Sequence, residues 1–331
     1  MNKFDNMEFE HEHIQTEIEQ LHDAVQQVKT EIAKVIVGQS GMIDLMIAAI
    51  LADGHVLIEG VPGVAKTLSA KLLSRCLSVP FSRIQFTPDL MPSDVLGTSV
   101  FNPQHGSFTF KKGPIFSNIV LIDEINRSPA KTQAALFEVM EEKQITYDGQ
   151  TYLMPPPFLV LATQNPIEQE GTYRLPEAQL DRFMFKIVVG YPTLDEELVI
   201  LQYTHAGKTT HFAEEVKPVL TAADIERYRG ITAGLHVEEK VMRYIAELVF
   251  ETRNNKALFL GGSPRASVAV LKSAKAIAAI SGRNFVTPDD VIKVLPAVLR
   301  HRIILTPEKE MEGGTPDEVV AAIIKKVEVP R

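Results

Sequence analysis

The chain has 331 residues and a formal net charge of −8, from 42 acidic and 34 basic side chains. This length accommodates about two domains, and the excess of acidic residues argues against nucleic acid as a partner, because proteins that bind its backbone normally carry a basic stripe. The single cysteine, Cys76, excludes an internal disulfide and a thiolate zinc cluster.

No segment reaches the roughly 18 uninterrupted apolar residues that a membrane-spanning helix needs. The first residues, MNKFDNMEFEHEH, are too acidic for a signal peptide. We therefore expect a cytoplasmic protein without a membrane span.

An amphipathic helix is predicted at the N-terminus. From Ile14 to Val35, apolar residues recur at alternating spacings of four and three, which places them on one face of a helix. We expect an N-terminal helical arm over residues 1–34 that packs on its own domain or on a neighbouring chain. A coiled coil is the alternative, although three heptads are marginal support for it.

Short apolar runs alternating with helical patterns follow this arm. The runs are HVLIE (55–59), RIQFT (83–87), NIVLIDE (118–124), FLVLAT (158–163) and FMFKIVV (183–189). Strands that are buried on both faces have this near-continuous apolar character. The sequence therefore predicts an α/β domain with a parallel sheet over residues 35–190.

Two inserts interrupt the alternation of strands and helices, at about residues 98–113 and 143–154. The first has two β-like runs around an Asn-Pro-Gln-His-Gly turn. The second centres on Asp148-Gly149, a pair that suits a two-residue hairpin turn because both positions tolerate positive φ. We expect each insert to form a β-hairpin outside the main sheet.

After Tyr191-Pro192 only helical patterns are found. Two of the helices have clear start signals, at Thr287-Pro288 and at Thr315-Pro316. Each offers an N-cap threonine, a proline at the first helical position and acidic residues in the first turn. We expect a smaller all-helical domain over residues 191–331, joined to the α/β domain by a short hinge.

The segment GVPGVAKT lies between the strand HVLIE and the helical run KTLSAKLLSRCLS. Backbone N–H groups at such a helix start form a cradle for phosphate. We expect Lys66 to reach the β- and γ-phosphates and the Thr67 hydroxyl to ligate magnesium. The expected nucleotide-binding residues here are Gly60, Val61, Pro62, Gly63, Val64, Ala65, Lys66, Thr67 and Leu68.

Ala65 stands where the usual phosphate-loop pattern has glycine. Its methyl group reduces the freedom of the backbone but removes no N–H donor. The phosphate cradle therefore survives, unless this position needs a positive φ.

Polar residues that could complete the site stand at the ends of two later strands. Asp123 is expected to hold magnesium, Glu124 to act as the base that polarises the attacking water, and Asn165 to orient that water. A strand that ends in Asp-Glu is commonly structural, and an Asn before Pro is commonly a turn residue. Their occurrence with the phosphate loop favours the functional interpretation, since ligands gather beyond the carboxyl ends of parallel strands.

Together these residues resemble the AAA+ ATPases, and within them the MoxR family, whose phosphate loop also reads GxPGxAKT. The resemblance covers nearly the whole chain and implies a P-loop NTPase fold, with an α/β/α domain, two inserted hairpins, a helical lid and a working site despite Ala65. The other segments that carry it are VIVGQ (35–39), LIDEINRSPAKTQAALFEVMEE, LATQNP, LPEAQLDRF and GGSPRA (261–266).

The resemblance also implies residue roles. Val37, Gly38 and Tyr191 are expected to bind the nucleotide, the first two within the box on the adenine side. Arg182 would be the arginine finger that reaches the ATP of a neighbouring subunit, and Arg265 would contact the γ-phosphate from the lid.

The assignment of the finger leaves alternatives open. Arg127 and Arg174 compete with Arg182 for the role in trans. Arg182 could instead form a salt bridge with Asp181 or Glu177.

By resemblance, the protein would be an ATP- and Mg²⁺-dependent ATPase that assembles as a homo-oligomeric, hexameric ring. It would act as a chaperone-like remodeller, together with proteins that carry a von Willebrand factor type A domain, in metal insertion or in the maturation of client complexes. A nucleotide-gated scaffold with little turnover is one alternative. A DNA-remodelling motor is another, encouraged only by Lys111 and Lys112 on the first insert.

Overall fold

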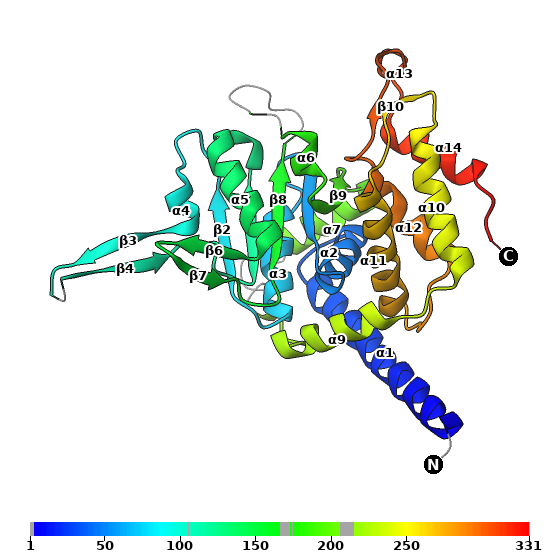
Figure 1. Cartoon of the computed structure of the whole chain (residues 1–331), viewed down its shortest axis with the longest axis horizontal. Helices are drawn as coiled ribbons and strands as arrows, with labels where there is room; N and C mark the ends of the chain where they lie inside the picture. The colour runs from blue at the N-terminus through cyan, green and yellow to red at the C-terminus, as the bar shows by residue number, and fades with distance from the viewer. Residues whose placement is uncertain (1–2, 105, 166–172, 174, 206–214, 331) are drawn as a thin grey trace.

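The computed structural model describes residues 3–104, 106–165, 173, 175–205 and 215–330, with side chains described from residue 14 onward. Figure 1 shows an α/β domain with a helical lid on one side of it and two hairpins on the other. The predicted fold class is thereby confirmed. None of the described helices is long and apolar enough to cross a membrane.

A five-stranded parallel sheet forms the centre of the α/β domain. Its strands lie in the order β2 (Phe81–Gln85), β5 (Ile119–Asp123), β8 (Leu159–Gln164), β1 (His55–Gly60) and β9 (Phe183–Val189). All five predicted runs form strands of this sheet, but β2 begins two residues before the predicted run and ends two residues before its end. Because the strands are parallel, their carboxyl ends meet at one edge.

Apolar side chains from both faces of the sheet are buried. Ile119 and Leu121 pack in one core with helices α2 (Ser40–Leu51) and α3 (Lys66–Cys76), whereas Val120 and Ile122 pack in a second core with α5 (Ala130–Glu142). Short elements complete this domain: α4 (Pro92–Leu96), η1 (Ile125–Arg127) and α6 (Glu177–Leu180). Cys76 at the end of α3 is fully buried, and burial raises the pKa of its thiol to about 12.

The N-terminal helix α1 (Lys3–Ala33) packs against its own chain. Ile18, Leu21, Val25, Val28 and Ile32 are at most 2% exposed and join the core that contains α2 and α3. The helix contacts α2, α3, α9 (Ala222–Gly234) and α11 (Pro264–Ile280). The apolar stripe predicted from the sequence therefore faces the core of this chain.

Both inserts form antiparallel hairpins that project from the sheet on the side away from the lid (Figure 1). The strands are β3 (Gly97–Asn102), β4 (Ser107–Lys112), β6 (Gln144–Tyr147) and β7 (Gln150–Leu153). The second hairpin turns through Asp148 and Gly149, which both have positive φ, as this turn requires. The ring of Phe110 joins the hairpins, with its centroid 4.6 Å from that of Tyr152 and 5.0 Å from that of Tyr147.

The described residues after β9 are mostly helical. Their helices are α7 (Leu194–His205), α9 (Ala222–Gly234), α10 (Glu239–Arg253), α11 (Pro264–Ile280), α12 (Pro288–Leu299), α13 (Pro307–Met311) and α14 (Pro316–Lys326). Thr287 and Thr315 form capping boxes at the predicted helix starts. The expectation of helices alone was wrong in one detail, because β10 (Leu258–Leu260) pairs with β11 (Ile304–Leu305). Strands this short leave no alternating pattern in a sequence.

A buried arginine fixes the lid to the sheet. Arg302, which is 8% exposed, donates through Nε to Asp181 Oδ1 at 2.7 Å and through Nη2 to the Phe183 carbonyl oxygen at 2.6 Å. Its Nη1 donates to the carbonyl oxygen of Met184 at 3.1 Å. The chain just after α12 is therefore bonded to the start of β9.

Candidate nucleotide site

The turn from β1 into α3 begins with a close contact between strands. A Cβ on Gly60 would lie 2.7 Å from the carbonyl oxygen of Val189 on β9, so only glycine fits there. The turn ends at Ala65, whose carbonyl oxygen accepts a hydrogen bond from Ser69 N at 2.9 Å and so starts the α3 ladder.

Ala65 has a φ of 58° and a ψ of 20°, in the left-handed region. The position therefore does need the positive φ that glycine adopts most readily. An L-residue in this conformation carries about 1–2 kcal/mol of strain. The alanine keeps its N–H, however, so the substitution costs stability and removes no donor from the loop.

The phosphate loop opens on a cavity of about 380 Å³ at the carboxyl edge of the sheet. Most of the predicted site residues converge on it from separate elements. Those that line the cavity are Pro62, Gly63, Val64, Ala65, Lys66, Thr67, Leu68, Asp123, Glu124 and Asn165. Gly60 and Val61 are not among its lining residues, although the Gly60 carbonyl oxygen accepts a hydrogen bond from Lys66 Nζ at 2.6 Å.

Burial lowers the pKa of the Lys66 ammonium, while the negative charges of Asp123, Glu124 and Glu59 act in the opposite direction. A lysine ammonium that lies in a cavity beside backbone N–H groups is suited to bind an anion such as a phosphate.

The two carboxylate oxygens of Asp123 have different partners. Oδ1 accepts a hydrogen bond from Thr163 Oγ1 at 3.1 Å. Oδ2 lies 3.5 Å from Thr67 Oγ1 and 2.6 Å from Arg83 Nε. A hydroxyl and a carboxylate that converge in this way form the hard oxygen donor set that suits Mg²⁺ beside phosphates, so the residues present fit this cation.

The backbone of Glu124 is also left-handed, with a φ of 58° and a ψ of 51°. Its N–H donates to Thr163 Oγ1 at 3.1 Å. Its carboxylate accepts a hydrogen bond from Gln85 Nε2 at 2.8 Å and pairs with Arg127 Nε at 3.1 Å. Strained backbone of this kind persists where the surroundings hold it, and it clusters at functional sites.

Arg83, Gln85 and Thr163 line the cavity as well, and the sequence analysis missed them. Gln85 pairs in register with Asp123, because β2 lies next to β5. The available signal was that two of the predicted runs contain polar residues, Arg83 and Gln85 in RIQFT and Thr163 at the end of FLVLAT. The sequence did not say which strands are neighbours in the sheet.

Three residues expected to bind nucleotide, Val37, Gly38 and Tyr191, do not line this cavity. A Cβ on Gly38 would meet the carboxylate of Glu196, which places Gly38 beside α7. Tyr191 is 73% exposed and lies two residues beyond Val189, the neighbour of Gly60. Tyr191 therefore lies near the phosphate-loop edge of the sheet, whereas Gly38 lies beside α7, the helix that follows Tyr191 in the chain.

The two arginines expected to contact a γ-phosphate share one carboxylate. Glu141 pairs through Oε2 with Arg182 Nη1 at 3.1 Å and through Oε1 with Arg265 Nη2 at 3.2 Å. Arg182 also donates to the carbonyl oxygen of Phe137 at 2.7 Å. Its ion pair is thus with Glu141 rather than with Asp181 or Glu177, the partners considered in the alternative, and Arg174 lies outside the described residues.

These arginines lie at the opposite edge of the sheet from Lys66. Arg182 immediately precedes β9, whose first residue Phe183 pairs with His55, the first residue of β1, whereas the phosphate loop follows the last residue of β1. Arg182 and Arg265 line a cavity of about 520 Å³ that shares no residue with the phosphate-loop cavity.

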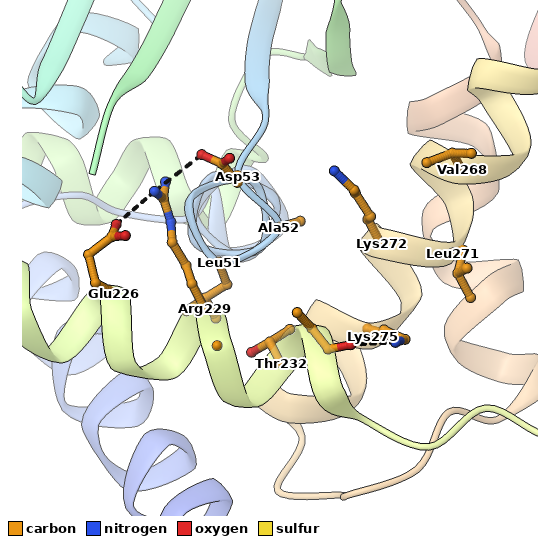
Figure 2. Close-up of a pocket in the computed structure, with 12 residues that line it drawn as sticks. Leu51, Ala52, Asp53, Glu226, Arg229, Thr232, Val268, Leu271, Lys272 and Lys275 are labelled. Atoms are coloured by element: carbon orange, nitrogen blue, oxygen red, sulfur yellow. Dashed lines mark hydrogen bonds and ion pairs between the residues drawn. The ribbon is translucent and has the colours of Figure 1, made fainter. Parts of the chain in front are cut away.

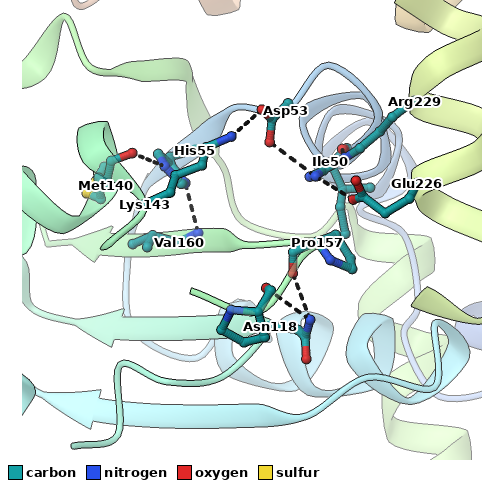
Figure 3. Close-up of polar contacts among 11 residues, drawn as sticks. Ile50, Asp53, His55, Asn118, Met140, Lys143, Pro157, Val160, Glu226 and Arg229 are labelled. Carbon is teal, nitrogen blue, oxygen red and sulfur yellow. Dashed lines mark hydrogen bonds and ion pairs between the residues drawn. The ribbon is translucent and has the colours of Figure 1, made fainter. Parts of the chain in front are cut away.

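Polar contacts fix this amino edge (Figure 3). His55 Nδ1 accepts a hydrogen bond from Val160 N at 3.0 Å, and Nε2 lies 3.1 Å from the Met140 carbonyl oxygen. Burial lowers the pKa of His55 to about 4, so the ring is neutral near pH 7. Asp53 pairs with Arg229 at 3.2 Å and with Lys143.

A further cavity of about 630 Å³ lies between the end of α2, α9 and α11 (Figure 2). Lys272 points from α11 into it, and Arg229 pairs there with Asp53 and Glu226. Asp53, Val268 and Lys272 line both this cavity and that of Arg182, so the two cavities adjoin each other.

The parallel sheet and the phosphate loop that follows its β1 strand define a P-loop nucleotide-binding protein. Residues 55–185 match the ATPase family associated with various cellular activities (AAA), and residues 250–323 match the AAA lid domain.

Similar proteins narrow this class further. Chaperone MoxR1 of Mycobacterium tuberculosis is 44% identical over 91% of this chain and 81% of its own, and protein MoxR of Paracoccus denitrificans is 31% identical over 83% and 87%. A crystal structure of a Cytophaga hutchinsonii protein, proposed to be an ATPase, superposes with a TM-score of 0.89 at 42% identity, over 97% of this chain and 99% of the other. The chain belongs to the MoxR family of AAA+ ATPases.

Proposed function

We propose that the protein hydrolyses ATP in a Mg²⁺-dependent reaction and uses it to remodel other proteins as a chaperone. The observation that carries the proposal is the convergence of Lys66, Thr67, Asp123, Glu124 and Asn165 on one cavity. Membership of the AAA family supports a nucleotide as the ligand. The similarity to a protein named as a chaperone supports the remodelling of proteins as the function.

Each residue has a role in this reaction. The loop N–H groups and Lys66 bind the phosphates, and Thr67 and Asp123 would hold Mg²⁺, which supplies charge neutralisation when bound. Glu124 accepts the proton of the attacking water, and Asn165 orients that water toward the γ-phosphate. The Glu124 carboxylate accepts a hydrogen bond from Gln85 and forms an ion pair with Arg127. Both contacts must break before this carboxylate can bind the attacking water.

Arg182 and Arg265 would serve the nucleotide of a neighbouring chain in a ring, taken as hexameric from the resemblance. The six residues of β1 separate them from their own phosphate loop by about 20 Å, at roughly 3.3 Å per residue. Their common partner Glu141 would release them when the neighbour's phosphates approach. Arg127, which is paired with Glu124 in its own chain, is less suited to the role in trans.

The cellular role in this proposal follows the family resemblance. A ring that changes shape with hydrolysis would move its projecting hairpins against a client, with a von Willebrand factor type A domain protein as partner and with metal insertion or complex maturation as the result. ATP as the substrate agrees with a cytoplasmic location.

Phosphate release by Glu124→Gln tests the proposal. Loss of a general base typically costs 10²- to 10⁴-fold in rate, so we expect a fall on the order of 10²-fold or more. Binding of ATP is expected to persist in Glu124→Gln and to be lost in Lys66→Ala. Glu312→Gln is the matched control, because Glu312 is an exposed member of a pair with Lys309 on the lid. A Glu124→Gln protein that releases phosphate like the wild type would instead support the scaffold alternative.

A further inference from the structure

Arg83 on β2 is bound to the carboxylate on which the proposed metal site depends. Its Nε lies 2.6 Å from Asp123 Oδ2, and its Nη2 lies 3.4 Å from Gln85 Oε1. Its side chain is 53% exposed, whereas that of Asp123 is 10% exposed. The guanidinium therefore reaches the acid from the open side of the cavity, where it can leave without repacking the core.

The arginine and a metal ion would need the same oxygen. Asp123 Oδ1 is already bound by the Thr163 hydroxyl, which also accepts the N–H of Glu124. Oδ2 is the oxygen that lies nearest the Thr67 hydroxyl. A cation or its bound water that joins Thr67 to Asp123 must therefore use the oxygen that Arg83 now occupies.

In the nucleotide-free protein, the contact with Arg83 compensates the negative charge of Asp123. Asp123 and Glu124 place two carboxylates beside the loop that receives phosphates. Glu124 is paired with Arg127, and Asp123 is paired with Arg83. A poorly solvated carboxylate without a cation is costly, and it would repel an approaching triphosphate.

We propose that Arg83 is a positioning residue that holds Asp123 in place of the divalent cation, and that the cation displaces it from Oδ2 when it binds with nucleotide. This inference rests on the proposed nucleotide site. Under this proposal, binding of the metal and release of Arg83 are coupled. The Arg83 guanidinium neutralises Asp123 in the empty site, and the divalent cation neutralises it in the loaded site.

The competition has two consequences of opposite sign. Removal of the guanidinium frees Oδ2, so a divalent cation binds more tightly in the presence of nucleotide. Removal also leaves the carboxylate charge uncompensated, so nucleotide binds more weakly when no metal is present. An arginine that only orients Asp123 for the metal would give the reverse of the first effect.

The test measures binding and not turnover. Mn²⁺, which prefers the same carboxylate and water ligands as Mg²⁺, is titrated into protein saturated with ADP, and the free ion is followed by electron paramagnetic resonance. ADP affinity is measured separately in EDTA. The variants are Arg83→Gln and Arg83→Lys, with Lys309→Gln as a control that removes one positive charge from an exposed lid pair.

We expect Arg83→Gln to lower the dissociation constant of Mn²⁺ by about fivefold, the upper range for one partly exposed ion pair, and to weaken metal-free ADP binding. Arg83→Lys keeps the charge, so its affinities for Mn²⁺ and for metal-free ADP should lie between those of Arg83→Gln and the wild type. If Arg83→Gln does not fold, Arg83→Lys is the variant that tests the inference. Unchanged or weaker Mn²⁺ binding in the variants overturns the inference alone. A wild-type protein that binds no ADP with Mn²⁺ overturns the proposed function and this inference with it.

Discussion

The left-handed backbone of Ala65 shows what a single residue contributes to the phosphate loop. The sequence predicted a cradle that survives the missing glycine unless the position needs positive φ. The structure gives it a φ of 58° and yet keeps the hydrogen bond from Ser69 N to its carbonyl oxygen. The strain is thus a cost to stability that leaves the donors of the loop in place.

We predict that Ala65→Gly stabilises the protein. Relief of the left-handed strain stabilises the folded protein by about 1–2 kcal/mol. The greater freedom of glycine stabilises the unfolded chain by about 0.4–1 kcal/mol, which acts in the opposite direction. The net gain in the free energy of unfolding is therefore about 0.5–1 kcal/mol, measured by urea denaturation, with ADP affinity within about twofold of the wild type.

Ala70→Gly is the matched control, because Ala70 lies fully buried within the same helix, α3. Glycine inside a helix costs about 1 kcal/mol, so this variant should be less stable than the wild type. Equal destabilisation by the two substitutions would show that the loop does not hold Ala65 under strain.

Residues within local motifs could be predicted from the sequence, and residues brought in by neighbouring strands could not. Lys66 and Thr67 belong to one continuous pattern, and Asp123 and Glu124 end one apolar run. Arg83 reaches Asp123 only because β2 lies beside β5, a strand order that no local pattern encodes. Cross-strand contacts are the physical reason that part of the site was missed.

At the level of elements, burial on both faces explains why the main strands were predictable. A strand such as β5, which is buried along its whole length, leaves a continuous apolar run in the sequence. The strands β10 and β11, with three and two residues, leave none. The ends of β2 were misplaced for a related reason, since Phe86 is fully buried although it lies beyond the strand.

At the two hairpins, aromatic rings of β4, β6 and β7 are packed together. Phe110 on β4 contacts Tyr152, Tyr147 and Phe116. The second hairpin directly follows α5, which packs on the sheet next to β5 and its Asp123. A movement at the nucleotide edge can therefore reach the first hairpin through this aromatic cluster.

We predict that Phe110→Ala separates the hairpins. Each aromatic pair contributes about 0.5–1.5 kcal/mol beyond the area it buries, so amide hydrogen exchange should accelerate in β3–β4 and in β6–β7 together. The control is Phe108→Ala on the same strand, where the ring is 69% exposed and packs on Phe101. Faster exchange confined to β3–β4 in Phe110→Ala would contradict the coupling.

At the scale of the whole molecule, the sheet separates the two groups of residues that take part in the proposed reaction. The phosphate loop, Asp123 and Glu124 lie at its carboxyl edge, whereas Arg182 and Arg265 lie with Glu141 at its amino edge. The contacts of Arg302 with Asp181 and with β9 hold the lid beside this second edge. In the proposed function, a single chain would therefore present its nucleotide at one edge and a pair of arginines at the other, as a heterologous interface that closes into a ring requires.

Mixing two inactive variants tests this shared site directly. Arg182→Ala keeps Glu124 but offers its neighbour no finger, and Glu124→Gln keeps Arg182 but lacks the base. We expect each alone to release phosphate slowly, since an arginine finger is worth about 10³- to 10⁵-fold in related enzymes. In mixed rings about one interface in four joins an intact Glu124 to an intact Arg182, so activity should rise toward a quarter of the wild type.

Dilution separates a shared site from a site within one chain. If the arginine comes from a neighbour, the specific activity of the wild type falls as the ring dissociates, and the mixture loses its regained activity over the same range of concentration. Mixing Glu124→Gln with Lys66→Ala, which leaves Arg182 intact in both chains but restores no complete nucleotide edge, is the control and should stay inactive. Activity of the wild type that is flat on dilution, with no recovery in the first mixture, would place the whole site within one chain and contradict the shared site.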